Sequence, residues 1–139
     1  MIKEFVKYEQ ALSLKELGFD EKCLAYWFNE TPLNPEGQCL VYYRKPYDNV
    51  GITNGIIREY GWAPTYSQSF RWFREKYKLY PEIGLHDRED EKTWRFTISI
   101  LGYYELAYNQ NVGKEPYYKT YEEAESACLD KLVEIIKNK

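Results

Sequence analysis

Apolar and polar residues alternate from Trp94 to Ile100 in segment 94–101, and this pattern constrains the fold more than any other. The apolar members are Trp94, Phe96, Ile98 and Ile100, and the residues between them are Arg95, Thr97 and Ser99. Successive side chains of a strand point to opposite faces of its sheet. The segment therefore predicts a strand with one buried face, which other elements must cover.

Further strands are predicted at 23–28, 39–43 and 80–85, and another at 103–108. The first two flank a turn-rich connection and predict an antiparallel hairpin. The strand at 80–85 precedes 94–101, with a charged hairpin tip at 87–92 between them. Pro and Gly recur through residues 44–64. This composition predicts a long irregular loop, and such loops often have a function.

Three helices are predicted, at 7–17, 65–78 and 120–137. The first ends before Gly18, which suits a left-handed C-cap, with Phe19 as its apolar contact. The other two begin with capping boxes, in which a Thr is followed three residues later by Gln or Glu. Helix 65–78 carries an aromatic stripe that we expect in the core, formed by Tyr66, Phe70, Phe73 and Tyr77.

These elements give the order α-β-β-α-β-β-(β)-α. We expect an α+β fold with three helices on a mainly antiparallel sheet of about four or five strands. The chain has 139 residues, which is the usual length of one domain, so we expect a single domain over residues 1–139.

The charge balance argues against a polybasic partner surface. The chain has 19 Lys and Arg against 22 Asp and Glu, a net charge of −3, whereas binding to phosphate backbones needs a basic surplus. The first ten residues lack the apolar region of a signal peptide, and no apolar run approaches the ~20 residues of a membrane helix. We therefore expect a cytoplasmic protein, without membrane contact and without nucleic acid.

Catalytic motifs are missing from the sequence. Cys23, Cys39 and Cys128 are odd in number and lack CxxC spacing, so we expect reduced, mostly buried thiols. The one histidine, His86, stands beside Asp87 at the predicted hairpin tip, where a solvated turn explains it better than a metal site. Phosphate loops and nucleophile elbows are also missing. We predict no catalytic residue, no metal and no cofactor.

Aromatic residues make up 18% of the chain, and two places combine them into candidate binding sites. On helix 65–78, Tyr66 and Trp72 accompany Arg71 and Arg74, a combination suited to ring and phosphate recognition. The competing interpretation is a solvated basic face beside an ordinary core stripe. The exposure of Trp72 and of the arginines distinguishes the two.

The second place is the hairpin, which carries Tyr26, Trp27, Tyr42 and Tyr43. Neighbours alternate between faces, so whichever set points away from the helices forms an aromatic surface of the kind that marks interfaces. We take Trp27 and Tyr43 as interface candidates. The competing interpretation is that a loop or another strand covers that surface.

Several segments resemble a group of short uncharacterised bacterial and prophage-associated proteins with no assigned activity. The resemblance spans most of the chain, is concentrated in its helices, and rests on residues 63–77 (APTYSQSFRWFREKY), 118–125 (YKTYEEAE), 8–11 (YEQA) and 17–19 (LGF). It implies an accessory or mobile-element protein and supplies no catalytic residue.

The leading hypothesis is a non-enzymatic binding or protein-interaction module that binds a protein partner or a second copy of itself. The alternative is a protein that binds a small nucleotide-like anion through aromatic stacking and arginines, with residues 44–64 as a lid. Single-stranded nucleic acid binding is disfavoured by the net charge, and an enzyme would rest only on His86 and scattered carboxylates.

Overall fold

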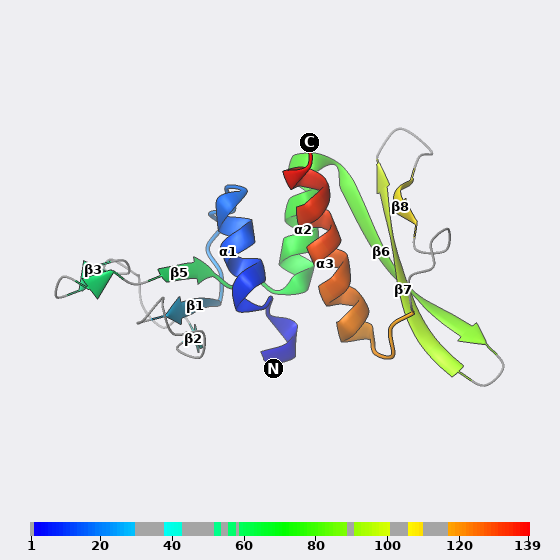
Figure 1. Ribbon diagram of the computed structural model, residues 1–139, viewed down its shortest axis with the longest axis horizontal. Helices are drawn as coiled ribbons and strands as arrows, with labels where there is room; N and C mark the ends of the chain where they lie inside the picture. Colours follow the sequence, from blue (N-terminus) through cyan, green and yellow to red (C-terminus); the bar gives the residue numbers. More distant parts are fainter. Residues whose placement is uncertain are drawn as a thin grey trace. The chain divides into compact units, whose positions relative to one another are not determined.

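The computed structural model describes residues 2–29, 38–42, 52–53, 56–57, 59–88, 91–100, 106–109 and 117–139 (Figure 1). These residues group into two compact units, Met1–Thr65 and Tyr66–Lys139. The prediction of one domain over 1–139 is not decided by this division and stays a prediction. The described residues form an α+β fold with three α-helices, which confirms the predicted class.

The first unit begins with a short 3-10 helix, Ile2–Glu4, followed by α1, Tyr8–Glu16. Gly18 closes α1 in the left-handed conformation, with φ of 96°. The Gly18 N–H donates to the oxygen of Lys15, and the Phe19 N–H donates to that of Leu14. Phe19 and Leu14 are both buried, as this type of helix end requires. The predicted C-cap is thus confirmed.

Three antiparallel strands form the sheet of the first unit, in the order β2-β1-β5. They are β1, Ala25–Asn29, β2, Gln38–Tyr42, and β5, Glu59–Trp62. The predicted hairpin is β1 paired with β2. A separate pair of very short strands, β3, Ile52–Thr53, and β4, Ile56–Ile57, lies between β2 and β5 in the sequence. The core beneath α1 contains Phe5, Ala25 and Ala63.

The second unit is built on a three-stranded antiparallel sheet, in the order β6-β7-β8. Its strands are β6, Leu79–Arg88, β7, Glu91–Ile100, and β8, Leu106–Asn109. Phe96 and Ile98 of β7 are buried, which confirms the buried face predicted from the alternation. Pairing of β6 with β7 extends from Leu79 opposite Ile100 to Arg88 opposite Glu91.

Two helices pack on this sheet: α2, Tyr66–Tyr77, and α3, Tyr121–Lys137. Tyr66, Phe70 and Phe73 of the predicted aromatic stripe are buried, and Tyr77 is partly buried. A single residue, Lys78, connects α2 to β6 and has a positive φ of 56°.

The Thr120 hydroxyl caps α3 by accepting a hydrogen bond from the Glu123 N–H at 3.1 Å. The Glu123 carboxylate in turn accepts from the Lys119 N–H at 3.3 Å. The capping box predicted at this helix start is confirmed. Four side chains on the core side of α3 are fully buried: Ala124, Cys128, Leu129 and Leu132.

The structure corrects three expectations. The described strands form separate sheets instead of one, because β1 pairs with β2 and β5, while β7 pairs with β6 and β8. Residues 44–64 are not irregular throughout, since β3, β4 and β5 lie within them. The hairpin tip expected at 87–92 is shorter, because β6 continues to Arg88 and β7 begins at Glu91.

Candidate functional site

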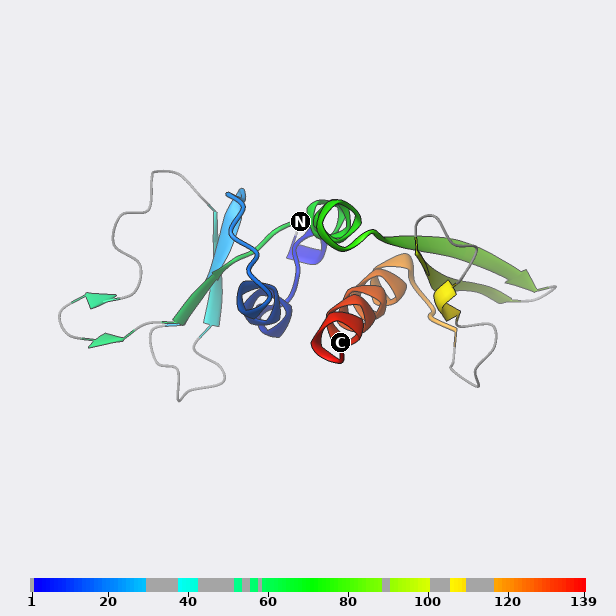
Figure 2. The same ribbon diagram turned by 90° about the horizontal axis from the view of Figure 1, so that it is seen from above.

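The register of the β2-β1-β5 sheet assigns its side chains to two faces. Gly61 of β5 faces α1, because a Cβ atom added to it would lie 3.4 Å from the main-chain oxygen of Ala11. Trp27 is paired with Gly61 on β5 and with Leu40 on β2, and directly opposed residues share a face. Trp27 and Leu40 therefore lie on the helix side, and Figure 2 shows α1 against this side.

Trp27 has structural contacts on that side. Its Nε1–H donates to the main-chain oxygen of Val6 at 2.7 Å, and its ring stands edge-on to Tyr8, with centroids 6.2 Å apart. The indole packs against the small core of Phe5, Ala25 and Ala63. The other hairpin candidate, Tyr43, lies outside the described residues.

Among the residues whose side chains the structure describes, four lie on the opposite face: Tyr26, Phe28, Cys39 and Trp62. Tyr26 is opposed by Trp62, and Phe28 is opposed by Cys39. The three aromatic side chains are partly exposed, and Cys39 is exposed. None of the four carries a charge at neutral pH. We call this set the outer aromatic face.

The Tyr26 hydroxyl and the Cys39 thiol interact across this face. Partial burial raises the pKa of the Tyr26 hydroxyl, and the nearby Cys39 raises it further. Tyr26 therefore stays neutral at physiological pH and keeps its hydroxyl as a donor. The face combines apolar ring surface with a polar tip, which is typical of side chains that anchor protein contacts.

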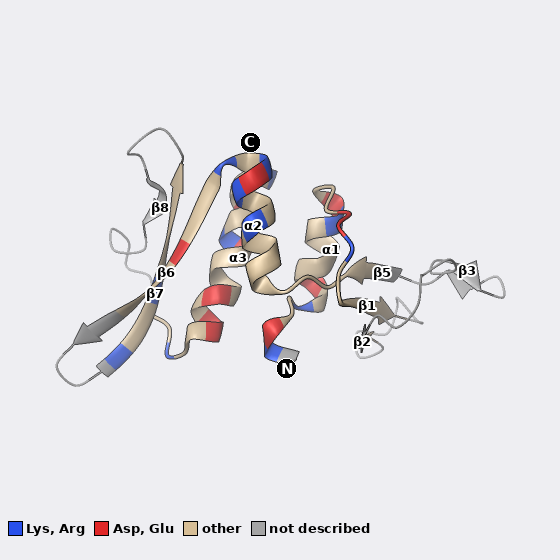
Figure 3. Cartoon of the chain, turned by 180° about the vertical axis from the view of Figure 1, so that it is seen from behind, with Lys and Arg blue, Asp and Glu red and all other residues tan. Residues whose placement is uncertain are grey.

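The second set of candidates, on α2, divides between the interior and the surface. Tyr66 and Trp72 are only 4% and 6% exposed. Arg71 is exposed and Arg74 partly exposed. The aromatic and basic residues expected to act together are thus not on one surface, although Figure 3 shows basic positions along α2.

The rings around Trp72 are already in contact with other groups. Trp72 stands edge-on to Phe73 and to Tyr77, with centroids 5.1 and 5.5 Å away. The Nζ of Lys76 lies 4.8 Å from the centroid of the Trp72 ring, a cation–π distance. A ligand ring could stack on Trp72 only after displacing these contacts.

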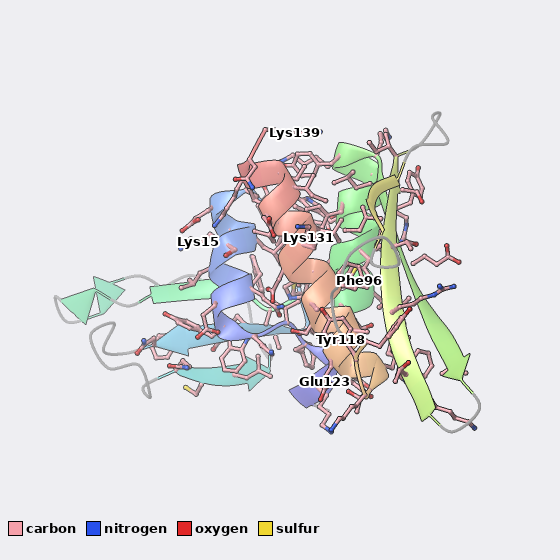
Figure 4. The ribbon with its side chains drawn as sticks, turned by 45° about the vertical axis from the view of Figure 1, so that its right-hand side comes forward. Lys15, Phe96, Tyr118, Glu123, Lys131 and Lys139 are labelled. Carbon is pink, nitrogen blue, oxygen red and sulfur yellow. The ribbon has the colours of Figure 1, made fainter. Side chains whose placement is uncertain are left out.

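A third group of ionisable side chains gathers at the start of α3. Partial burial and the neighbouring Glu122 raise the pKa of Glu125 to about 7. Burial and Glu125 raise the pKa of the Cys128 thiol well above its ordinary value. Nearby, Phe96 and Tyr118 stack with centroids 6.1 Å apart (Figure 4). The Tyr121 ring stands edge-on to Trp94 at 5.2 Å.

The thiols differ in environment. Cys23 and Cys128 are buried and Cys39 is exposed, so burial was correctly predicted for two of the three. The Cys23 thiol donates to the main-chain oxygen of Glu21 at 3.3 Å. Because the buried Cys128 thiol stays protonated, it is no ready nucleophile.

Sequence reasoning missed three members of the outer aromatic face, and it placed the first of them, Phe28, only within the strand predicted at 23–28. Trp62 belongs to β5, inside the segment expected to be a loop, and Cys39 was considered only as a buried thiol. Gly61 is the signal that could have found the face, because a glycine between two aromatic residues in a strand indicates a close approach by another element.

Comparison of the chain with protein-family models, with curated proteins and with solved structures gave no match. Within the described ranges, no group of three or more His, Cys, Asp or Glu side chains is arranged to hold a metal ion. Of the helices that the structure describes, none combines the length and the apolar content needed to cross a bilayer.

Proposed function

We propose that the protein is a non-enzymatic, cytoplasmic interaction module of accessory or mobile-element type, and that its outer aromatic face binds an apolar segment of a protein partner. The observation that carries this proposal is the composition of that face. Tyr26, Phe28 and Trp62 present partly exposed rings side by side, without a charge among them. Aromatic anchors of this kind supply most of the binding free energy in protein interfaces.

The chemistry of the face favours an apolar partner over a charged one. A charged group placed on it would lose water without gaining an opposite charge in return. The smaller Cys39 side chain stands opposite Phe28, so an apolar side chain of the partner can pack over Cys39 against the Phe28 ring.

The alternative, binding of a nucleotide-like anion on α2, receives less support from the geometry. It needs an exposed ring beside the arginines, whereas Trp72 is buried and in contact with Lys76. The outer aromatic face, in turn, has no cationic member to pair with phosphate. We therefore rank protein binding first.

The test is selection of peptides from a displayed random library on the immobilised full chain. We expect apolar, aromatic-rich peptides to be enriched, and Phe28→Lys to weaken their binding by at least about tenfold. The matched control, Arg74→Glu, changes charge on α2 and should leave the affinity unchanged. Peptides that bind Phe28→Lys as tightly as the parent chain, or failure to enrich any apolar sequence, would contradict the proposal. Thermal melting verifies that each variant is folded.

A further inference from the structure

Strand β6 is an edge strand of the sheet of the second unit. The strand order β6-β7-β8 pairs one side of β6 with β7, and none of the described residues pairs with the other side. The strand is ten residues long. In Figures 1 and 2 the far half of the β6-β7 hairpin extends past α2 and α3. A long open edge of this kind is a template for pairing with another strand.

Pro81 shows which main-chain groups point outward from β6. Proline has no N–H to donate, so within a sheet it occupies positions whose nitrogen faces away from the neighbouring strand. Pro81 is paired with Ile98 of β7, so its own main-chain groups point to the open edge. Main-chain direction alternates along a strand, so the groups of Ile83 and Leu85 point to the open edge as well.

The open edge adjoins an exposed apolar cluster. Leu85 is 47% exposed, although it lies in a regular strand opposite Trp94. The Trp94 ring contacts Tyr121, which is 41% exposed. Large apolar side chains grouped beside unpaired main-chain groups indicate a surface that another chain covers.

We propose that β6 pairs antiparallel with β6 of a second copy of this chain, about a two-fold axis at Gly84. In this register Ile83 of each copy lies opposite Leu85 of the other and exchanges two hydrogen bonds with it. The exposed Leu85 then gains an apolar cross-strand neighbour. Gly84 meets its own symmetry mate at a position where neighbouring strands approach most closely.

The same register opposes no two like charges. Glu82 falls opposite position 86, which is His, and Tyr80 falls opposite position 88, which is Arg. Asp87 falls opposite Pro81, where the missing proline N–H costs one hydrogen bond in each half of the pair.

The dimer is expected to be weak. Stable interfaces bury about 800 Å² on each partner, and one strand edge with Leu85 and its neighbours supplies less. Sedimentation velocity on the full chain, over roughly 1–500 μM, should therefore show a reversible monomer–dimer equilibrium that follows protomer concentration.

Leu85→Lys tests whether the open edge of β6 forms the dimer. A lysine there adds a charge beside the partner strand and removes the apolar contact, so the dissociation constant should rise at least about tenfold. Leu24→Lys is the matched control, because Leu24 is also exposed, at 73%, but belongs to the first unit. A chain that stays monomeric at every concentration, or one whose dimer is weakened equally by Leu24→Lys, overturns the proposal.

Disulfide trapping tests the register, with Cys39→Ser as background so that the exposed native thiol is removed. Gly84→Cys should form a covalent dimer under mild oxidation, since opposed Cα atoms in such a pair lie about 4.5 Å apart, within disulfide range. A Cβ at Gly84 comes no closer than 3.9 Å to another side chain, so the variant should fold. Glu82→Cys is the control, because its two copies would lie roughly 14 Å apart. Equal trapping of both variants overturns the register.

Discussion

Cys39 is the cysteine that solvent reaches among the three. We predict that one thiol per native chain reacts within minutes with a water-soluble disulfide reagent, and that Cys39→Ser removes this fast phase. Cys23 and Cys128 should react only on unfolding, because both are buried and burial holds the Cys128 thiol protonated. Intact mass spectrometry of the labelled chain is the measurement. Fast labelling that persists in Cys39→Ser would count against the described burial.

Glu125 makes the stability of the second unit depend on pH. Its pKa is raised from 4.5 to about 7 in the folded chain, so the folded state holds a proton that the unfolded state has released. Stability therefore falls as pH rises from about 4.5 to about 7, and is level above that. Below pH 4.5 the carboxyl is protonated in both states and the effect disappears.

Glu125→Gln should remove this dependence. We expect the variant to be more stable than the parent above pH 7 by roughly 1 kcal/mol, a figure kept small because water screens the partly exposed carboxyl. At pH 4 the two chains should be equal. Urea unfolding at pH 4, 6 and 8 is the measurement, with Glu9→Gln on α1 as the exposed control. A gain that is the same at all three values would refute the assignment.

At the scale of the element, the start of α3 depends on Thr120. Removing its hydroxyl leaves the Glu123 N–H without its acceptor, so Thr120→Ala should lower the free energy of unfolding by about 1 kcal/mol. Ser67→Ala, at an exposed position of α2, is the control and should change little. Chemical unfolding followed by helical circular dichroism measures both. A loss at Thr120 no larger than at Ser67 would mean that the cap contributes nothing.

Helices were predicted well because their signals are local. Thr120 with Glu123 marks the start of α3, and Gly18 with Phe19 marks the end of α1, each within a few residues of the feature it determines. The strand β5 was missed because its pairing partner, β1, lies some thirty residues away in the sequence and Gly61 interrupts its apolar pattern. Strand pairing over such a separation leaves no local mark.

At the scale of the whole molecule, the sequence was enough for the α+β class but not for the division into sheets. The β1-β2 and β6-β7 hairpins each pair strands that follow one another in the sequence. The pairing of β5 with β1, by contrast, accompanies the packing of Gly61 against α1. An aromatic surface on the hairpin was predicted, but not which residues form it. Which ring points outward depends on register, and a shift of one residue would have exchanged Tyr26 for Trp27.

Lys78 alone joins α2 to β6, in a conformation that side chains seldom adopt. A one-residue connection cannot accommodate a change in chain length. An extra residue there would exchange the two faces of β6, so that the buried Leu79 would move to the opposite face of the sheet. Among natural variants of this chain, gains and losses of residues should therefore accumulate elsewhere, and the distance from the end of α2 to the start of β6 should be its least variable spacing.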